Sequence, residues 1–159
     1  MKRRDAGMLF EFEEVTTPNR QAYKPLLLMA DDSEAMVNTY ISEGQLYEAR
    51  IGDDIIGVLL CAEIEPNVVE LKNIALRPTY RGKGIGKEMV ATALEMYAQK
   101  GYEKMIIGTA NCSIDNIALY QKMGFRLYDV KKDFFASYPK PITEFGIRGV
   151  DMWMFERAL

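Results

Sequence analysis

The chain has 159 residues, of which 48% are hydrophobic, a formal net charge of −3 and no histidine. This size predicts one domain over residues 1–159, and the longest apolar run, residues 55–62, is too short to cross a bilayer, so a cytoplasmic protein without a membrane partner is expected. Because imidazole is absent, Ser–His and Cys–His nucleophile pairs and ordinary zinc hydrolase sites are excluded, and proton transfer must use carboxylates, tyrosines, lysines or water.

The first half of the chain predicts one strand, two short helices and then three strands in a meander. Pro25 suits the first turn of the first helix, and Ser33 suits the N-cap of the second. Turn-forming residues at 52–54 and 66–67 favour turns between the later strands. The expected strands cover residues 10–15, 46–51, 55–64 and 68–76, and the expected helices cover 25–29 and 33–44.

The second half alternates helices and strands. Apolar residues recur at helical spacing after residue 85, and Gly101 favours the end of that helix. Ser113 is expected to cap a further helix, which Gly124 ends. The expected strands cover residues 105–108, a run that begins at 125, and residues 150–155. The whole pattern predicts an α/β single domain with a mixed sheet.

The two cysteines form neither a metal-binding pattern nor a disulfide framework. Cys61 lies in an apolar, strand-like run, and Cys112 lies in a turn-like segment. We therefore expect Cys61 to be a core thiol and Cys112 to be an incidental surface thiol, and we expect no metal site.

The most informative segment is the run 78–88, which lies between a strand-like and a helix-like run. Gly82, Gly84 and Gly86 carry no Cβ, so the backbone can approach a ligand closely, and the helix that follows presents unpaired amides to an anion. Four cations lie in or beside this run of a chain that is acidic overall: Arg77, Arg81, Lys83 and Lys87. The segment predicts a phosphate-binding loop.

Spacing excludes two well-known phosphate loops. A Walker A loop has four residues between its glycines and Ser or Thr after its Lys, but only three residues separate Gly82 from Gly86, and Glu88 follows Lys87. The dinucleotide pattern Gly-x-Gly-x-x-Gly fails as well, because its third glycine would fall on Lys87 or Met89.

Two blocks of sequence resemble the GNAT superfamily of N-acetyltransferases. Arg81-x-x-Gly84-x-Gly86, preceded by residues 73–78, resembles the acyl-CoA loop of that superfamily. Residues 117–125, Ile-Ala-Leu-Tyr-Gln-Lys-Met-Gly-Phe, resemble its later helix-to-strand segment, which contains Leu-Tyr and ends in Gly-Phe. The two blocks occur in order at a suitable separation, and the resemblance covers residues 46–128.

The resemblance implies a GNAT-like fold with a mixed central sheet of about seven strands and four or so helices, in which strands four and five splay apart and hold CoA. It implies transfer of an acetyl group from acetyl-CoA to a primary amine, by direct attack in a ternary complex and without a metal. The acceptor is a small amine or a peptide or protein amine, and a homodimer is compatible with the family.

The resemblance also implies a set of cofactor-binding residues. In the family the strand before the loop pairs with pantetheine, and the Leu76 N–H is placed to polarise the thioester carbonyl. Asn111 and Ser113 stand where many relatives have an Asn that contacts CoA. The implied cofactor-binding residues are Ile74, Ala75, Leu76, Arg81, Gly82, Lys83, Gly84, Ile85, Gly86, Asn111 and Ser113.

Two residues are the catalytic candidates that the resemblance suggests. Tyr120, within Leu-Tyr-x-x-x-Gly-Phe, would protonate the departing thiolate, and its alternative role is a packing tyrosine. Glu70 would act as general base through water, and the alternatives are water alone or another carboxylate, with Glu63 and Glu65 of the neighbouring strand as the reserve candidates. Period-two alternation predicts that Glu70, Lys72, Ile74 and Leu76 point to one side of the sheet.

The segment 133–141, between the last two strands, is unusually aromatic for a loop. Its rings either cover the edge of the core or wall the acceptor site, where they could hold an alkyl or ammonium group.

Two other functional classes stay open at this point. The chain could be a non-catalytic acyl-CoA-binding regulatory module that keeps the loop without a productive base. Alternatively, the loop could bind a nucleic-acid backbone, but the basic residues are few and the protein is acidic, so no nucleic-acid partner is expected.

Overall fold

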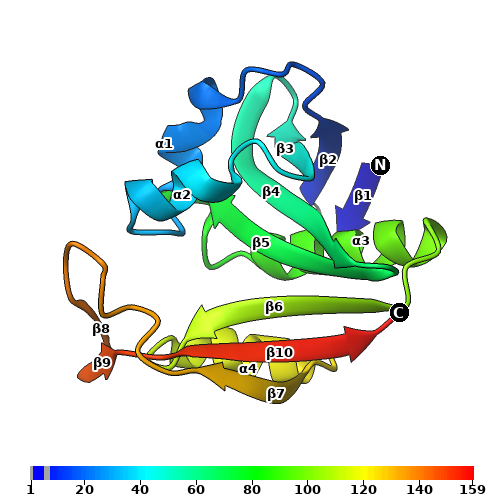
Figure 1. The fold of residues 1–159 in the computed structure, drawn as a ribbon. Coiled ribbons are helices and arrows are strands. Elements are labelled where there is room, and N and C mark those ends of the chain that lie inside the picture. The colour runs from blue at the N-terminus through cyan, green and yellow to red at the C-terminus, as the bar shows by residue number, and fades with distance from the viewer. Residues whose placement is uncertain (1, 6–7) are drawn as a thin grey trace.

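A computed structural model describes residues 2–5 and 8–159 of the chain. One large sheet has the strand order β1-β2-β3-β4-β5-β6-β10-β7, and β8 and β9 form a separate hairpin (Figure 1). The strands are β1 (Lys2–Asp5), β2 (Met8–Glu14), β3 (Gln45–Ile51), β4 (Asp54–Glu65), β5 (Val68–Leu76), β6 (Lys104–Ala110), β7 (Arg126–Lys131), β8 (Ile142–Glu144), β9 (Ile147–Gly149) and β10 (Met152–Ala158). The helices are α1 (Lys24–Leu27), α2 (Glu34–Tyr40), α3 (Ile85–Gln99) and α4 (Ile114–Lys122), with short 3-10 turns η1 (Gln21–Tyr23) and η2 (Pro78–Tyr80).

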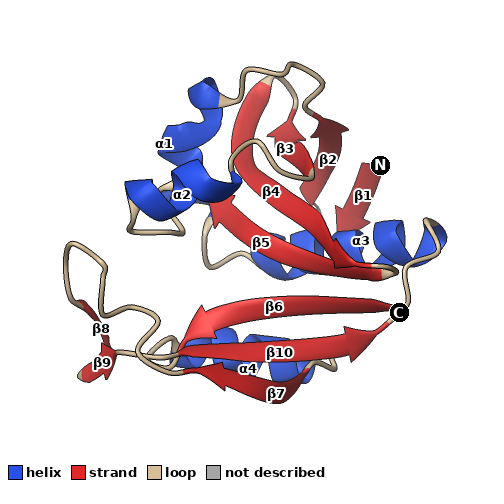
Figure 2. Cartoon of the chain, in the orientation of Figure 1, coloured by secondary structure: helices blue, strands red, loops and turns tan. Residues whose placement is uncertain are grey.

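The predicted mixed α/β sheet is confirmed. Strands β2 to β7 and β10 correspond to the seven predicted from the sequence, and the four α-helices fall where helices were expected (Figure 2). The short strand β1 and the hairpin β8–β9 were not predicted. All neighbouring strands of the large sheet run antiparallel except β5 and β6, which are parallel.

Two apolar cores lie on the two faces of the sheet. One packs the buried side of α3, including Met89, Ala93 and Tyr97, against strands β3 to β6 and β10. The other packs Leu27 of α1 and Val37 of α2 against β3, β4 and β5. The helix pairs α1–α2 and α3–α4 therefore cover opposite faces of the sheet, as Figure 1 shows.

Strands β5 and β6 pair only over their first halves. The ladder joins Val68–Leu71 to Lys104–Ile107 and ends there, although both strands continue (Figure 1). These are strands four and five of the predicted set, so the expected divergence is confirmed. Because the backbone of β5 beyond Leu71 has no ladder partner on this side, its polar groups are available to another molecule.

A β-bulge in β5 overturns the prediction that Glu70, Lys72, Ile74 and Leu76 share one side. Leu60 of β4 pairs with Asn73, whereas the next residue, Cys61, pairs with Leu71, so the extra residue Lys72 has no partner on β4. Leu71 packs with the α3 core, but Asn73 binds α1 and α2 through Leu27 O and the Tyr40 hydroxyl. One inserted residue reverses the alternation, so Glu70 lies on the α1–α2 face while Ile74 and Leu76 pack on the α3 face.

Two helix caps differ in outcome. Ser33 caps α2 as predicted, since its hydroxyl accepts a hydrogen bond from Met36 N at 3.1 Å. Ser113 occupies the N-cap position of α4 but makes no side-chain cap, so that prediction is wrong. Its hydroxyl instead donates to Glu144 Oε1 of β8 at 3.2 Å, because the unpredicted hairpin brings a carboxylate within reach.

The two cysteines are both buried. Cys61 is a core thiol as expected, but the prediction of a surface position for Cys112 is wrong. The hairpin β8–β9 covers Cys112 so closely that a Cβ on Gly149 would collide with its Sγ. Within the described residues, none of the helices has the length and apolar character needed to cross a membrane.

Candidate functional site

The glycine loop is open on the side that a ligand would approach. Gly82 and Gly84 adopt φ of 74° and 83°, the left-handed region that favours glycine, and Gly84 is the N-cap of α3. A Cβ built on Gly82, Gly84 or Gly86 would meet no atom within 4 Å, so the space over the loop is empty of protein. The loop can therefore admit an anion against the amides at the start of a fifteen-residue helix.

The cations of the loop have different surroundings. Arg81 Nε donates to Leu76 O at 2.9 Å, and Arg77 Nε donates to Ile55 O at 2.7 Å, so both guanidinium groups help to tie the loop to the sheet. Lys83 Nζ lies 5.9 Å from the centre of the ring of Tyr80, which packs partly buried against the α3 core. Ile85 is buried in the α3 core, which leaves its backbone as the part that could contact a ligand.

The end of β5 presents its backbone toward the divergence from β6. Arg77 N donates to Ile56 O of β4 at 2.8 Å. Successive residues of an extended strand direct their N–H and C=O groups to opposite edges, so the N–H groups of Leu76 and Ile74 point away from β4. That edge is where the predicted pantetheine pairing would have to occur.

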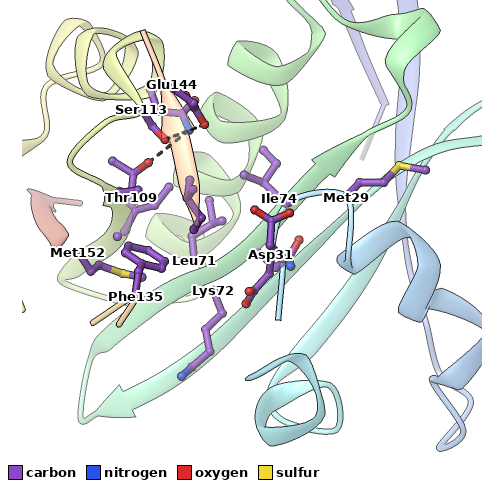
Figure 3. Close-up of a pocket in the computed structure, with 18 of the residues that line it drawn as sticks. Met29, Asp31, Leu71, Lys72, Ile74, Thr109, Ser113, Phe135, Glu144 and Met152 are labelled. Carbon is purple, nitrogen blue, oxygen red and sulfur yellow. Dashed lines mark hydrogen bonds between the residues drawn. The ribbon is translucent and has the colours of Figure 1, made fainter. Parts of the chain in front are cut away.

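A cavity of about 310 Å³ opens where β5 and β6 diverge, and it is lined from both faces of the sheet (Figure 3). Asp31, from the connection between α1 and α2, and Lys72 of β5 line it on one side. Ser113 and Tyr120 of the α4 region line it on the other. The cavity thus connects the α1–α2 face with the α3–α4 face through the sheet.

A second cavity of about 180 Å³ adjoins the first on the α1–α2 face. Glu70 lines this second cavity, together with Lys131 and Phe134. Residues that line both cavities are Asp31, Leu71, Lys72, Gly108, Tyr138 and Met152.

Tyr120 lines the larger cavity from α4. Its side chain is 4% exposed, and its ring packs against Phe125 and Phe155 with centroid distances of 6.0 and 6.2 Å. Burial is the cause that raises the pKa of its hydroxyl above the ordinary value of 10.0. A tyrosine in this state is neutral at neutral pH and is a weaker acid than an exposed tyrosine, but its hydroxyl can donate a hydrogen bond.

Glu70 lies beside a cation in the wall of the smaller cavity. Its carboxylate is 3.8 Å from Lys72 Nζ, which is also 3.8 Å from Glu43. The reserve candidate Glu63 accepts a hydrogen bond from the Tyr102 hydroxyl at 2.8 Å. Neither Glu63 nor the other reserve candidate, Glu65, lines either cavity. The structure therefore brings Glu70, and not its alternatives, to the cavities.

Asn111 and Ser113 are engaged with the protein itself. Asn111 Oδ1 accepts hydrogen bonds from Val150 N and Asp151 N at 2.8 and 3.0 Å, and its Nδ2 donates to Arg148 O at 3.1 Å. One amide hydrogen of Asn111 is left for a ligand. Ser113 lines the larger cavity, where Glu144 holds its hydroxyl (Figure 3).

The aromatic loop contributes to both cavities. Its three rings pack together with centroid distances of 4.8 to 6.2 Å, and Phe135 and Tyr138 line the larger cavity. The Tyr138 hydroxyl donates to Asp31 Oδ1 at 2.9 Å, so the loop reaches across to the α1–α2 connection. Burial, followed by the negative charge of Asp31, raises the pKa of the Tyr138 hydroxyl, which therefore stays a hydrogen-bond donor.

Asp31, Asn73 and Glu144 are among the polar residues of the larger cavity that were not predicted. Asp31 stands in an acidic pair before a helix cap, a pattern typical of any helix start, so nothing in the sequence distinguished it. Glu144 lies in the unpredicted hairpin. The sequence did carry an indication for Asn73, since a polar residue at a buried position of an otherwise apolar strand needs a hydrogen-bond partner.

Comparison with protein families gives one match that covers most of the chain. Residues 9–125 match the family described as acetyltransferase (GNAT) family. Among curated proteins, the chain is 41% identical over 128 residues to the N-acetyltransferase YvbK of Bacillus subtilis, which covers 80% of this chain and 83% of the relative.

Solved structures of similar proteins have the same fold. An IAA acetyltransferase from Bacillus cereus is 38% identical with a TM-score of 0.87, covering 94% of this chain and 99% of the other. A GNAT family acetyltransferase from Elizabethkingia anophelis with acetyl-CoA bound is 35% identical with a TM-score of 0.87, at 94% and 98% coverage. A Bacillus subtilis acetyltransferase in complex with CoA is 37% identical with a TM-score of 0.85, at 94% and 99% coverage.

Proposed function

Since this chain belongs to the GNAT family of acetyltransferases, we propose that it transfers an acetyl group from acetyl-CoA to a primary amine by direct attack in a ternary complex. The observation that carries the proposal is the cavity at the divergence of β5 and β6, which is lined from both faces of the sheet. A thioester approaching from the α3–α4 face and an amine approaching from the α1–α2 face can meet there without any movement of the sheet.

The residues present fit acetyl-CoA. The Cβ positions of Gly82, Gly84 and Gly86 face open space, so a ligand can approach the backbone closely there, and the loop amides would bind the pyrophosphate. The free edge of β5 at Ile74 and Leu76 would pair with the pantetheine arm, with Ala75 between them holding the strand in register with β4. The Leu76 N–H would then stabilise negative charge that develops on the thioester oxygen. Two similar proteins were crystallised with acetyl-CoA or CoA.

Direct attack is favoured because the protein offers no activated nucleophile at the cavity. Both thiols are buried, and burial raises the pKa of Cys61 to about 12 and also raises that of Cys112, so neither supplies a thiolate. The chain contains no histidine that could activate Ser113 or Thr109. The amine nitrogen must therefore form the new bond to the acetyl carbon as the bond from that carbon to sulfur breaks.

Two residues are assigned the proton transfers, Glu70 of the smaller cavity and Tyr120 of the larger one. An alkylamine with a pKa near 10 is only about one part in a thousand neutral at pH 7, so its deprotonation accounts for about 4 kcal/mol of the barrier. Glu70, on the α1–α2 face, would remove this proton directly or through water. Tyr120, which lines the larger cavity, would protonate the departing thiolate.

The proposal is tested by release of free thiol from acetyl-CoA in the presence of a panel of amines, amino acids, polyamines, aminoglycosides and peptides. Calorimetric titration with CoA measures binding separately. Thiol release that depends on an amine supports acetyl transfer. Tight CoA binding without thiol release for every acceptor class would instead support a regulatory acyl-CoA-binding module.

A further inference from the structure

Asp31 is a carboxylate placed at the junction of the two cavities. It lines both of them, and it comes from the connection between α1 and α2 (Figure 3). Its Oδ2 accepts a hydrogen bond from the Tyr40 hydroxyl at 2.9 Å, and its Oδ1 accepts from the Tyr138 hydroxyl at 2.9 Å and from Ser33 N at 3.2 Å. These donors hold the carboxylate in one orientation, and all of them are neutral.

No cation of the described residues forms an ion pair with Asp31. Two lysines line the cavities, Lys72 and Lys131. The Nζ of Lys72 lies 3.8 Å from a carboxylate oxygen of Glu70 and 3.8 Å from one of Glu43. Lys131 lies over the ring of Phe134, with its Nζ 5.9 Å from the ring centre. The negative charge of Asp31 is therefore hydrogen-bonded but not neutralised. A half-buried carboxylate in this state is stabilised by a cation that enters the cavity.

Aromatic rings surround this carboxylate. Tyr40 and Tyr138, which both donate to it, line the smaller cavity beside Phe134, and Phe135 lines the larger one. The face of such a ring attracts a cation, and Lys72 Nζ already lies 6.0 Å from the centre of the Tyr40 ring. Rings and a carboxylate together are suited to an ammonium group with an apolar substituent.

The charge of the cavity walls favours the same ligand. Four carboxylates, those of Asp31, Asp32, Glu70 and Glu144, line the two cavities, against the two cations Lys72 and Lys131. A concave surface with this excess of negative charge concentrates cations and disfavours acceptors that carry a carboxylate next to the amine.

We infer that Asp31 is the specificity-determining residue for the acceptor: it binds the ammonium group of a cationic alkyl or arylalkyl amine within the rings of Tyr40 and Tyr138. The inference rests on the proposed function, because the bound amine is an acceptor only if the protein transfers an acetyl group. It selects amines that lack an adjacent carboxylate over α-amino acids. Asp31 is not assigned a proton-transfer step.

The test is a binding experiment on the CoA-bound protein, so that it does not depend on turnover. Benzylamine, which is charged at pH 7, and benzyl alcohol, its uncharged isostere, are titrated by calorimetry into the parent protein and into Asp31→Asn. The parent should prefer benzylamine by about tenfold or more, because a hydrogen bond to a charged group is stronger than a neutral one. Asp31→Asn should lose that preference while binding benzyl alcohol as before.

Asp32→Asn is the matched comparison, since it removes the same charge from the adjacent, exposed residue of the same cavity. It should keep most of the preference for benzylamine, with a change of less than about threefold. Equal losses in the two variants would show that a general field selects the cation, and the assignment to Asp31 would be wrong. Retention of the preference in folded Asp31→Asn would overturn it as well.

A crystal structure of the parent protein with CoA and benzylamine covers the case in which Asp31→Asn does not fold. The amine nitrogen should lie within hydrogen-bonding distance of the Asp31 carboxylate, and benzylamine bound elsewhere, or not bound, would contradict the inference. The two proposals fail separately. Absence of thiol release with every amine would overturn acetyl transfer, whereas absence of a preference for benzylamine in the parent protein would overturn only the inference about Asp31.

Discussion

The two sides of the central cavity are built in different ways. The side proposed to bind CoA consists mainly of backbone from one continuous stretch, the end of β5 and the glycine loop before α3. The side proposed to bind the acceptor consists of side chains from segments far apart in the sequence, and the hydrogen bond between Tyr138 and Asp31 spans 107 positions. A site made of consecutive backbone amides requires glycines at fixed spacing, whereas a site made of distant side chains needs only that the fold bring them together.

The largest effect is expected in the glycine loop. Gly84→Asp should weaken the CoA affinity measured by calorimetry by about a hundredfold or more. The substitution places a side chain and a negative charge at a left-handed position beside the amides at the start of α3. Gly52→Asp is the matched control, since Gly52 also has a positive φ and open space around its Cα but lies in the β3–β4 turn. It should lose similar stability and keep CoA affinity. Unchanged CoA affinity in Gly84→Asp would contradict the loop assignment.

The second effect concerns Tyr120 in the wall of the larger cavity. Tyr120→Phe should lower kcat by about 10²- to 10³-fold and leave CoA affinity nearly intact, because a positioned general acid contributes a factor of that order and the packing of the ring is retained. Tyr102→Phe, which removes a hydroxyl bonded to Glu63 and not to a residue of the cavities, should leave kcat unchanged. If Tyr120→Phe kept full kcat from pH 6 to 10 under conditions in which chemistry limits the rate, Tyr120 would be a packing residue.

The third effect tests the acceptor side. Glu70→Gln keeps the size of the side chain and removes its basicity, so kcat/KM should fall by about 10- to 100-fold, most strongly at low pH, where the amine is most protonated. CoA affinity should hardly change. Glu63→Gln serves as control, because Glu63 contacts Tyr102 away from the cavities. A pH–rate profile of Glu70→Gln that overlays the parent profile would assign the base to water or to another carboxylate.

A smaller effect separates anchoring from cofactor contact at Asn111. Asn111→Ala should lower the free energy of unfolding by about 1–3 kcal/mol, because the backbone N–H groups of Val150 and Asp151 lose their acceptor. CoA affinity of the folded protein should change by less than about threefold. Asn111→Asp retains an acceptor oxygen and should recover part of the stability. A large loss of CoA affinity at unchanged stability would reverse this assignment.

The smallest effect lies in the core beneath both sides. Burial raises the pKa of Cys61 to about 12, while an unfolded cysteine titrates near 8.5. The unfolded state therefore loses its proton first as pH rises, so this contribution to stability is complete below about pH 8.5 and is lost between there and the folded pKa. Urea unfolding should show a decrease of about 1 kcal/mol between pH 8.5 and 9.5 that is absent in Cys61→Ala. A parallel decrease in both proteins would assign it to other groups.

Sequence patterns predicted regular elements well and contacts between them poorly. Helix and strand positions follow from periodicity and from residues such as Ser33, Gly101 and Gly124, whose roles depend on the local backbone. The bulge at Lys72 was invisible, because a single inserted residue changes which face later residues occupy without changing the strand-like composition. The roles of Ser113 and Cys112 depended on the hairpin β8–β9, whose three-residue strands carry little signal.

By itself the sequence determined the mixed α/β fold and, through the family resemblance, the divergence of β5 and β6, since glycine spacing and apolar periodicity are local properties of the chain. It also predicted that the glycine loop binds phosphate. Only the tertiary structure decided that Glu70 faces α1 and α2, that Glu63 lies away from the cavities, and that Asp31 meets Tyr40 and Tyr138. The physical reason is that these relations depend on strand register and loop packing, which join residues whose separation along the chain gives no indication of their separation in space.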